Sequence, residues 1–116
     1  MERVVALMDD LFFQMKLAET AKHLGLKVKV AANYEGLAPL LEEAPRLLIV
    51  DLNSRNEPVK VIERIRAAKN DLRIVGFLSH VQVDLAQQAR AAGCDEVLPR
   101  SAFTKNLAEI LRAAKD

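Results

Sequence analysis

The sequence has few cysteines, few aromatic residues and almost no excess charge of either sign. Its one cysteine, Cys94, has no partner for an internal disulfide, which is typical of a reducing compartment. Aromatic residues make up 4% of the chain, with no Trp and one Tyr, so a stacking platform for single-stranded nucleic acid is not expected. Lys and Arg number 17 against 16 Asp and Glu. That balance excludes a protein that binds nucleic acid through a clustered positive excess.

Long apolar segments are lacking as well. The apolar run near the N-terminus stops at Asp9 and Asp10, which fits neither a signal peptide nor a membrane span. What is present is the composition of a globular domain, with 51% apolar and 28% charged residues. A chain of 116 residues can bury enough surface to fold without disulfides or a structural metal. We expect residues 1–116 to form a single stand-alone cytoplasmic domain with no output domain attached and no membrane association.

Short β-type runs alternate with helical periodicity along the whole chain. The pattern predicts five strands, at 3–8, 27–31, 47–50, 73–78 and 96–98. It predicts five helices between and after them, at 11–24, 37–41, 58–68, 84–92 and 101–114. The segment 27–31 alternates polar and apolar residues, as a half-exposed edge strand does, whereas 47–50 is apolar throughout and predicts a strand buried on both faces.

Residues at the expected helix ends support these boundaries. Gly25 and Gly93 are expected to end helices, because glycine adopts left-handed backbone without strain. Pro58 suits a first helical turn. Asp84 and Ser101 are predicted to cap the two helices that follow them.

Alternation at this spacing predicts a parallel sheet with right-handed crossovers and helices on both faces. A barrel needs about eight such units, so the predicted fold is α/β, a flavodoxin-like doubly wound five-stranded sheet with strand order 2-1-3-4-5. Ligands of such sheets lie outside the carboxyl ends of the strands. The residues just after each strand are therefore the candidate functional residues.

Charged and polar side chains follow four of the predicted strands. Asp9 and Asp10 follow the first, Asp51 the third, Ser79 the fourth and Arg100 the fifth. Strands one and three are neighbours in the predicted order, so three carboxylates would converge on one crevice, where like charges need an offset. A divalent cation such as Mg²⁺, a proton or the Arg100 guanidinium would supply it. A carboxylate beside such a cation can attack a phosphoryl donor.

Each of these aspartates also has a purely structural explanation. Asp is common at strand ends because it caps the next helix and suits turns, and Asp10 alone could cap the helix that begins at Leu11. Three carboxylates at one sheet edge, with a hydroxyl and a cation on the adjacent strands, favour a site organised by an anion or a metal.

The sequence resembles a response-regulator receiver domain, the fold of CheY-like proteins. The resemblance spans essentially the whole chain and rests on VVALMDD (4–10), LIVDL (48–52), IVGFLS (74–79) and AAGCDEVL (91–98). It implies that Asp9 and Asp10 form the acidic pair and that Asp51 is the phosphoacceptor. It also implies that Mg²⁺ binds these carboxylates and the backbone carbonyl of Asn53, that the Ser79 hydroxyl contacts the phosphoryl group, and that a histidine kinase is the partner.

Several positions depart from the family pattern. The usual Lys-Pro after the last strand is Arg100-Ser101, and the loop after the acceptor carries charges at Arg55 and Glu57 instead of the usual Met, Pro and Gly. The residue after the switch hydroxyl is His80 where Ala or Gly is usual, and the switch aromatic is replaced by Val97. An Arg100 guanidinium is larger than an ammonium and planar, and it can form a lasting ion pair with Asp51.

The sequence is compatible with three functions. The departures favour an atypical receiver, or pseudo-receiver, that acts through protein–protein interaction with impaired or absent phosphorylation. The acidic cluster and Ser79 favour a phosphorylation-competent single-domain response regulator that takes phosphate onto Asp51 with Mg²⁺. The third is an unrelated small α/β enzyme, which lacks support because no phosphate loop or nucleophile–base pair is recognisable; we expect a non-enzymatic protein.

Two surfaces are candidates for partner contact. Of Phe12 and Phe13, we expect one ring to pack inward and the other to be exposed beside the acidic pocket. The resemblance implies a second contact face on the last two helices and last strand, where Ala86, Ala89 and Ala92 would leave room for close approach.

Overall fold

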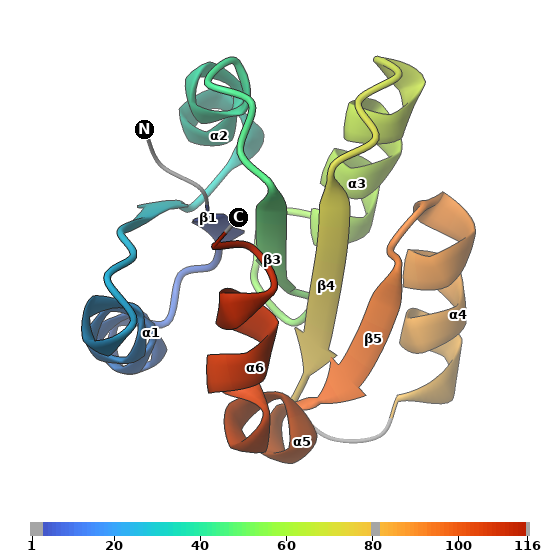
Figure 1. The fold of residues 1–116 in the computed structure, drawn as a ribbon. Coiled ribbons are helices and arrows are strands. Elements are labelled where there is room, and N and C mark those ends of the chain that lie inside the picture. The colour runs from blue at the N-terminus through green and yellow to red at the C-terminus, as the bar shows by residue number, and fades with distance from the viewer. Residues whose placement is uncertain (1–3, 80–81, 116) are drawn as a thin grey trace.

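The sheet of the computed structural model, which describes residues 4–79 and 82–115, has five parallel strands. They are β1 (Val4–Leu7), β2 (Val28–Ala31), β3 (Leu47–Asp51), β4 (Arg73–Leu78) and β5 (Glu96–Pro99). Their order is β2-β1-β3-β4-β5, with every neighbouring pair parallel (Figure 1). The predicted doubly wound fold and its strand order are confirmed.

Helices cover both faces of the sheet. They are α1 (Leu11–His23), α2 (Tyr34–Leu41), α3 (Pro58–Ala67), α4 (Val83–Ala92), α5 (Arg100–Lys105) and α6 (Leu107–Arg112). The described residues thus contain six helices, and the expectation of five was wrong. The last predicted helix is interrupted at Asn106, whose side-chain amide donates to the carbonyl of Ala102 at 2.9 Å. Asparagine competes with regular helix by such local bonds.

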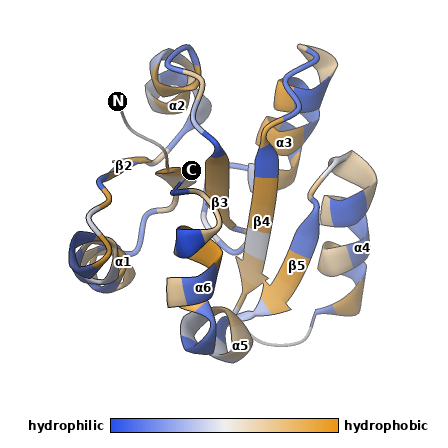
Figure 2. Cartoon of the chain, in the orientation of Figure 1, coloured by the Kyte–Doolittle hydropathy of each residue, from blue (hydrophilic) through white to orange (hydrophobic). Residues whose placement is uncertain are grey.

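Alternation along the buried strands divides the core into two layers. Val5, Leu48 and Ile74 belong to the layer under α2, α3 and α4, whereas Ile49 and Val75 belong to the layer under α1, α5 and α6. Successive side chains of a strand point to opposite faces of the sheet. Figure 2 shows mostly hydrophobic strands between helices that carry both hydrophobic and hydrophilic residues. All five residues of β3 are buried, and β2 is a partly exposed edge strand. Both expectations are confirmed.

Most of the predicted helix signals are confirmed. Gly93 ends α4 with φ 120°, Gly25 follows the end of α1 with φ 74°, and Pro58 opens α3. Two predicted caps were wrong. Asp84 lies inside the first turn of α4, and Ser101 lies inside α5, so neither side chain is positioned to cap its helix.

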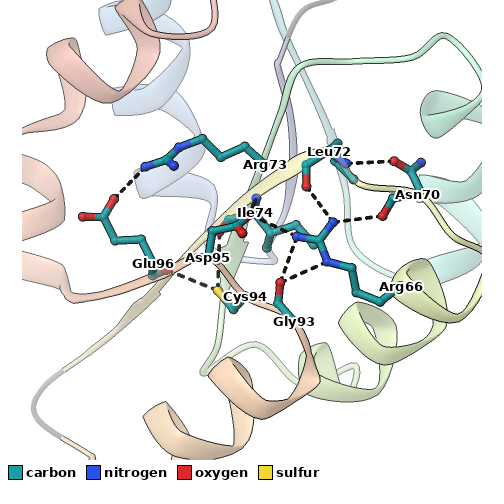
Figure 3. A network of polar contacts seen from close by, with 9 residues as sticks. All are labelled: Arg66, Asn70, Leu72, Arg73, Ile74, Gly93, Cys94, Asp95 and Glu96. Atoms are coloured by element: carbon teal, nitrogen blue, oxygen red, sulfur yellow. Dashed lines mark hydrogen bonds and ion pairs between the residues drawn. The ribbon is translucent and has the colours of Figure 1, made fainter.

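Arg66, a half-buried residue of α3, forms hydrogen bonds at the amino ends of β4 and β5. Arg66 of α3 donates to the carbonyl of Gly93 through Nε at 3.0 Å and Nη2 at 2.8 Å, and to the carboxylate of Asp95 at 3.0 Å. Its Nη1 also bonds the carbonyls of Asn70 and Leu72. Figure 3 shows this network joining α3 to the turn before β5.

No helix in the described ranges is long and apolar enough to cross a membrane.

Candidate functional site

The carboxyl edge of the sheet brings together the strand-end residues that the sequence singled out. Arg100 lies between two carboxylates: its Nη1 is 3.3 Å from Asp10 Oδ2, and its Nη2 is 3.9 Å from Asp51 Oδ2. Asp10 follows β1, Asp51 ends β3 and Arg100 begins α5, so the contact joins three elements. A guanidinium therefore provides the positive charge between these two aspartates.

Aromatic side chains form the floor under Arg100. Its guanidinium carbon lies 4.9 Å from the ring centroid of Phe13 and 5.3 Å from that of Phe77. Phe13 and Phe77 pack with Phe103, at centroid separations of 4.7 to 5.9 Å. A planar guanidinium can stack on rings while its nitrogens reach two carboxylates, which a lysine ammonium cannot do. The packing around this position therefore favours an arginine over a lysine.

Asp10 has two roles at once. Its Oδ1 accepts the backbone N–H of Phe13 at 3.1 Å and caps α1, while its Oδ2 faces Arg100. The Phe13 N–H has the largest effect and holds the pKa of Asp10 below its ordinary value; desolvation opposes it, and the hydrogen bond and charge of Arg100 lower the pKa further. The capping role expected of an aspartate at this position is therefore present alongside the ion pair.

Asp51 is the buried member of the cluster, with 6% of its side chain exposed. Burial raises its pKa, against the lowering effects of the Asn53 backbone N–H and Arg100, and the neighbouring charges of Asp9 and Asp10 raise it further. The Asn53 N–H donates to Asp51 Oδ1 at 2.9 Å. Burial is thus the largest influence on the ionisation of Asp51.

The Asp9 side chain hydrogen-bonds to the loop after β3 and not to Arg100. Its Oδ2 accepts from the backbone N–H of Arg55 at 3.2 Å and from Arg55 Nε at 3.3 Å. The Arg55 side chain is 88% exposed, so the side-chain ion pair is weak. The backbone contact ties this loop to the end of β1.

Asn53 uses its side chain in a way that the sequence did not suggest. Its Oδ1 accepts from the Ser79 backbone N–H at 2.7 Å and from the Ser79 hydroxyl at 3.0 Å. Its Nδ2 donates to Gln82 Oε1 at 2.9 Å. One amide therefore holds the end of β4 and the start of α4. The only available signal was an amide and a hydroxyl at the ends of adjacent strands.

Arginines face the carboxylates that the sequence predicted as Mg²⁺ ligands. Among the described residues, no three carboxylate, His or Cys side chains are grouped so that they could hold a metal. Asp9 and Asp10 direct oxygens to arginines, and Arg100 already offers the positive charge that a cation would supply at Asp51. Of the predicted metal ligands, the carboxylates of Asp9, Asp10 and Asp51 thus all face an arginine, and the backbone carbonyl of Asn53 remains a predicted ligand.

The remaining candidates are packing residues or lie outside the described ranges. Cys94 is buried, and this burial raises the pKa of its thiol. Val97 is buried too and lines a hollow of about 210 Å³ between α4 and β5. Ala86 and Ala89 are buried in the core rather than presented on a surface, so their proposed part in partner contact was wrong. His80 lies outside the described residues.

No protein-family model matches the sequence, and no curated protein matches it either. Solved structures do match. The receiver domain of NtrX from Brucella abortus is 17% identical, with a TM-score of 0.80 and 96% of both chains covered. The longer NtrX chain, solved in complex with ADP, is matched over 25% of its length, so this chain spans about a quarter of it.

Two further structures have the same fold. The signal receiver domain of the response regulator NarL from Mycobacterium tuberculosis is 18% identical, with a TM-score of 0.81 and coverage of 98% of this chain and 96% of that one. A response regulator from Burkholderia pseudomallei, solved with a phosphorylated aspartic acid, a calcium ion and citrate, is 20% identical, with a TM-score of 0.79 and coverage of 97% and 72%. The chain therefore has the fold of response-regulator receiver domains.

Proposed function

We propose that this chain is an atypical receiver module of two-component-type signalling that acts through protein–protein contact, with phosphorylation of Asp51 impaired or absent. The observation that carries the proposal is the position of Arg100 between Asp10 and Asp51. Its partner would be a histidine kinase or another signalling protein, and the module itself would not be an enzyme.

Electrostatics supports an impaired phosphoacceptor. Attack by a carboxylate on a phosphoryl donor brings together groups of like charge, so the site needs a cation that also contacts the incoming oxygens. Arg100 neutralises the two aspartates, but its guanidinium nitrogens face their carboxylates and its flat face lies over the rings of Phe13 and Phe77. The guanidinium is therefore not free to contact incoming phosphoryl oxygens. This use of the Arg100 guanidinium disfavours transfer.

The hydroxyl that would report phosphorylation also has another partner. Ser79 donates to Asn53 Oδ1, and the same amide bonds Gln82. The hydrogen bond from the Ser79 hydroxyl to Asn53 would have to be exchanged before this hydroxyl donated to a phosphoryl group. Val97 offers no aromatic ring for the usual coupling. These contacts support a module whose partner surface does not depend on phosphorylation.

The second candidate is a phosphorylation-competent response regulator that accepts phosphate on Asp51 from a histidine kinase with Mg²⁺. The observation in its favour is the placement of Asp51 at the carboxyl end of β3 beside β4 and its Ser79. The fold neighbour from Burkholderia pseudomallei carries a phosphorylated aspartic acid. Arg100 would then have to leave Asp51.

A phosphorylation assay separates the two candidates. The chain is incubated with Mg²⁺ and a small acyl phosphate, and its intact mass is measured over time. We expect no phosphoryl adduct above the level seen for Asp51→Asn, the matched control without the acceptor carboxylate. An adduct on the unaltered chain that Asp51→Asn lacks would refute the proposed function and establish the second candidate.

A further inference from the structure

A small hollow with apolar walls lies between α4 and β5, the edge strand of the sheet (Figure 1). Its volume is about 210 Å³, and the buried residues Leu78 and Val97 line it together with Pro99. Val83 lines it as well and is 61% exposed, so the hollow opens to solvent. We call this space the α4–β5 hollow.

Two features of the chain keep the α4–β5 hollow open and shaped. Val97 is short, and a longer side chain at this lining position would extend into the space. Gln82, another lining residue, is held by Asn53, whose Nδ2 donates to Gln82 Oε1 at 2.9 Å. The hollow is therefore preformed on this side, which reduces the ordering that binding requires.

The size of the α4–β5 hollow suits one side chain of a partner. Sites for whole small molecules usually measure about 300–1,000 Å³, whereas a cavity of about 150 Å³ holds a benzene ring. A volume of about 210 Å³ matches one large apolar side chain. Pockets of this kind at protein interfaces receive the anchor residue of a partner, and Val83 extends the apolar surface beyond the hollow.

The charge around the α4–β5 hollow has one sign. Its polar lining consists of Gln82, Gln87 and Arg90, and Arg90 is exposed. Within the described ranges Arg90 forms no ion pair. A guanidinium in this position attracts a carboxylate and also stacks on an aromatic ring. An aromatic side chain with an acidic neighbour therefore complements the hollow.

The described residues of a second copy do not offer this combination. Phe12 is the one exposed aromatic residue among them. The acidic residues that precede it, Asp9 and Asp10, already face Arg55 and Arg100. The complementary group therefore comes from a different protein.

We propose that the α4–β5 hollow is an anchor pocket for a partner protein segment that carries an aromatic side chain next to an Asp or Glu. The ring fills the space beside Val97, and the carboxylate pairs with Arg90. The inference rests on the proposed function in one respect, that the module acts through protein contact. It holds whether or not Asp51 accepts phosphate.

Titration of the 116-residue chain with capped dipeptides, followed by amide chemical shifts, tests the proposal. The probe is acetyl-Asp-Phe-amide, and we expect saturable shifts at Val83, Arg90 and Val97 with a Kd on the order of 1 mM. Acetyl-Asn-Phe-amide lacks the charge and should bind about threefold more weakly. Acetyl-Asp-Leu-amide lacks the ring and should bind more weakly than the probe.

Three variants locate the binding. Val97→Phe fills the hollow from within and should abolish the shifts. Arg90→Gln should remove the difference between the Asp and Asn peptides. Arg112→Gln is the matched control, because Arg112 is also an exposed arginine in the last turn of a helix, α6, and it should bind like the unaltered chain. Thermal unfolding checks that each variant is folded, and Arg90→Gln keeps the test decisive if Val97→Phe is not.

Several results would overturn the proposal. One is the absence of saturable shifts at Val83 and Val97 with acetyl-Asp-Phe-amide, and another is equal affinity for the three peptides. Tighter binding of free 3-phenylpropionate than of the peptide would indicate a small aromatic acid as the occupant. Shifts at these residues that depend on chain concentration alone would indicate a second copy. A phosphoryl adduct on Asp51 would leave all these outcomes unchanged, so the failure of one proposal is distinguishable from the failure of the other.

Discussion

At the scale of single residues, the choice of arginine over lysine at position 100 governs the chemistry of the acidic edge. The Arg100 fork contacts two carboxylates, and its face lies over Phe13 and Phe77. A lysine would supply one point charge on a mobile stem and leave the carboxylate oxygens open to another cation. The character of the site therefore depends on the geometry of this side chain more than on its charge.

Removing the guanidinium should leave Asp51 buried without a cation. We predict that Arg100→Gln lowers the free energy of unfolding by about 1–2 kcal/mol at neutral pH. This loss is smaller than that for a fully buried ion pair, because the side chains of Arg100 and Asp10 are one-third exposed. Urea denaturation measures it. Arg55→Gln is the matched control and should change stability little, because the Arg55 side chain is 88% exposed. Equal losses for both variants would contradict the assignment.

The pKa of Asp51 gives a prediction with a defined sign. Burial raises this pKa in the folded state, so the folded chain binds the proton more tightly than the unfolded chain. Ionised Asp51 thus opposes folding, and this penalty grows as pH rises through the folded-state pKa. Asp51→Asn should be more stable than the unaltered chain near neutral pH, by about 1 kcal/mol, and equally stable below the unfolded-state pKa.

Urea midpoints of the two chains, measured from acidic to neutral pH, check that sign. The difference between Asp51→Asn and the unaltered chain should widen as pH rises. A constant difference, or one that narrows towards neutral pH, would show that Arg100 outweighs burial at Asp51. The pKa of Asp10 is lowered, so the stability that its ionised form contributes is lost only as pH falls. Both chains contain Asp10, so this contribution largely cancels in the difference between them.

At the scale of helices and strands, the brace formed by Arg66 links α3 to the turn between α4 and β5. Gly93 has φ 120° there, and a Cβ at this position would lie 2.5 Å from Arg66 Cγ. The turn therefore needs glycine for two reasons, backbone conformation and space. Asp95 adds a third link, because its Oδ2 also accepts the backbone N–H of Ile74 at 2.8 Å.

Gly93→Ala should lose both advantages. We predict a loss of about 2–3 kcal/mol in the free energy of unfolding, from left-handed strain and displacement of Arg66. Gly25→Ala is the matched control: it has φ 74° but its nearest neighbouring atom would be 4.0 Å away, so about 1 kcal/mol of strain is expected. Thermal or urea unfolding compares the two. Equal losses would mean that the contact with Arg66 contributes nothing.

Secondary structure was largely predictable from the chain, for identifiable reasons. β3 and β4 stand out because apolar runs too short for a helix must be buried strands, and Gly93 stops α4 by a strong local rule. The cap predictions for Asp84 and Ser101 were wrong because capping depends on where the first turn begins, and α4 begins at Val83 and α5 at Arg100. The break at Asn106 depends on one side-chain bond, which periodicity does not reveal.

At the scale of the whole molecule, the fold shared with receiver domains determines where function can lie but not what it is. Parallel strand order predicted that Asp9, Asp10, Asp51, Ser79 and Arg100 would meet at one edge, and they do. The pairings within that edge were only partly predictable: an ion pair of Arg100 with Asp51 was anticipated, whereas the bridge to Asp10 and the Asn53 amide linking Ser79 to Gln82 depend on side-chain geometry.

The proposed function depends on Arg100 replacing the cation that a phosphoacceptor would need. The most direct test is a titration of the unaltered chain with Mg²⁺ and then beryllofluoride, with amide chemical shifts recorded for Asp51, Asn53 and Ser79. The same titration of Arg100→Lys is the comparison. We predict no site-specific shifts for the unaltered chain and saturable shifts for Arg100→Lys. Saturable shifts at these residues in the unaltered chain, equal to those of Arg100→Lys, would contradict it.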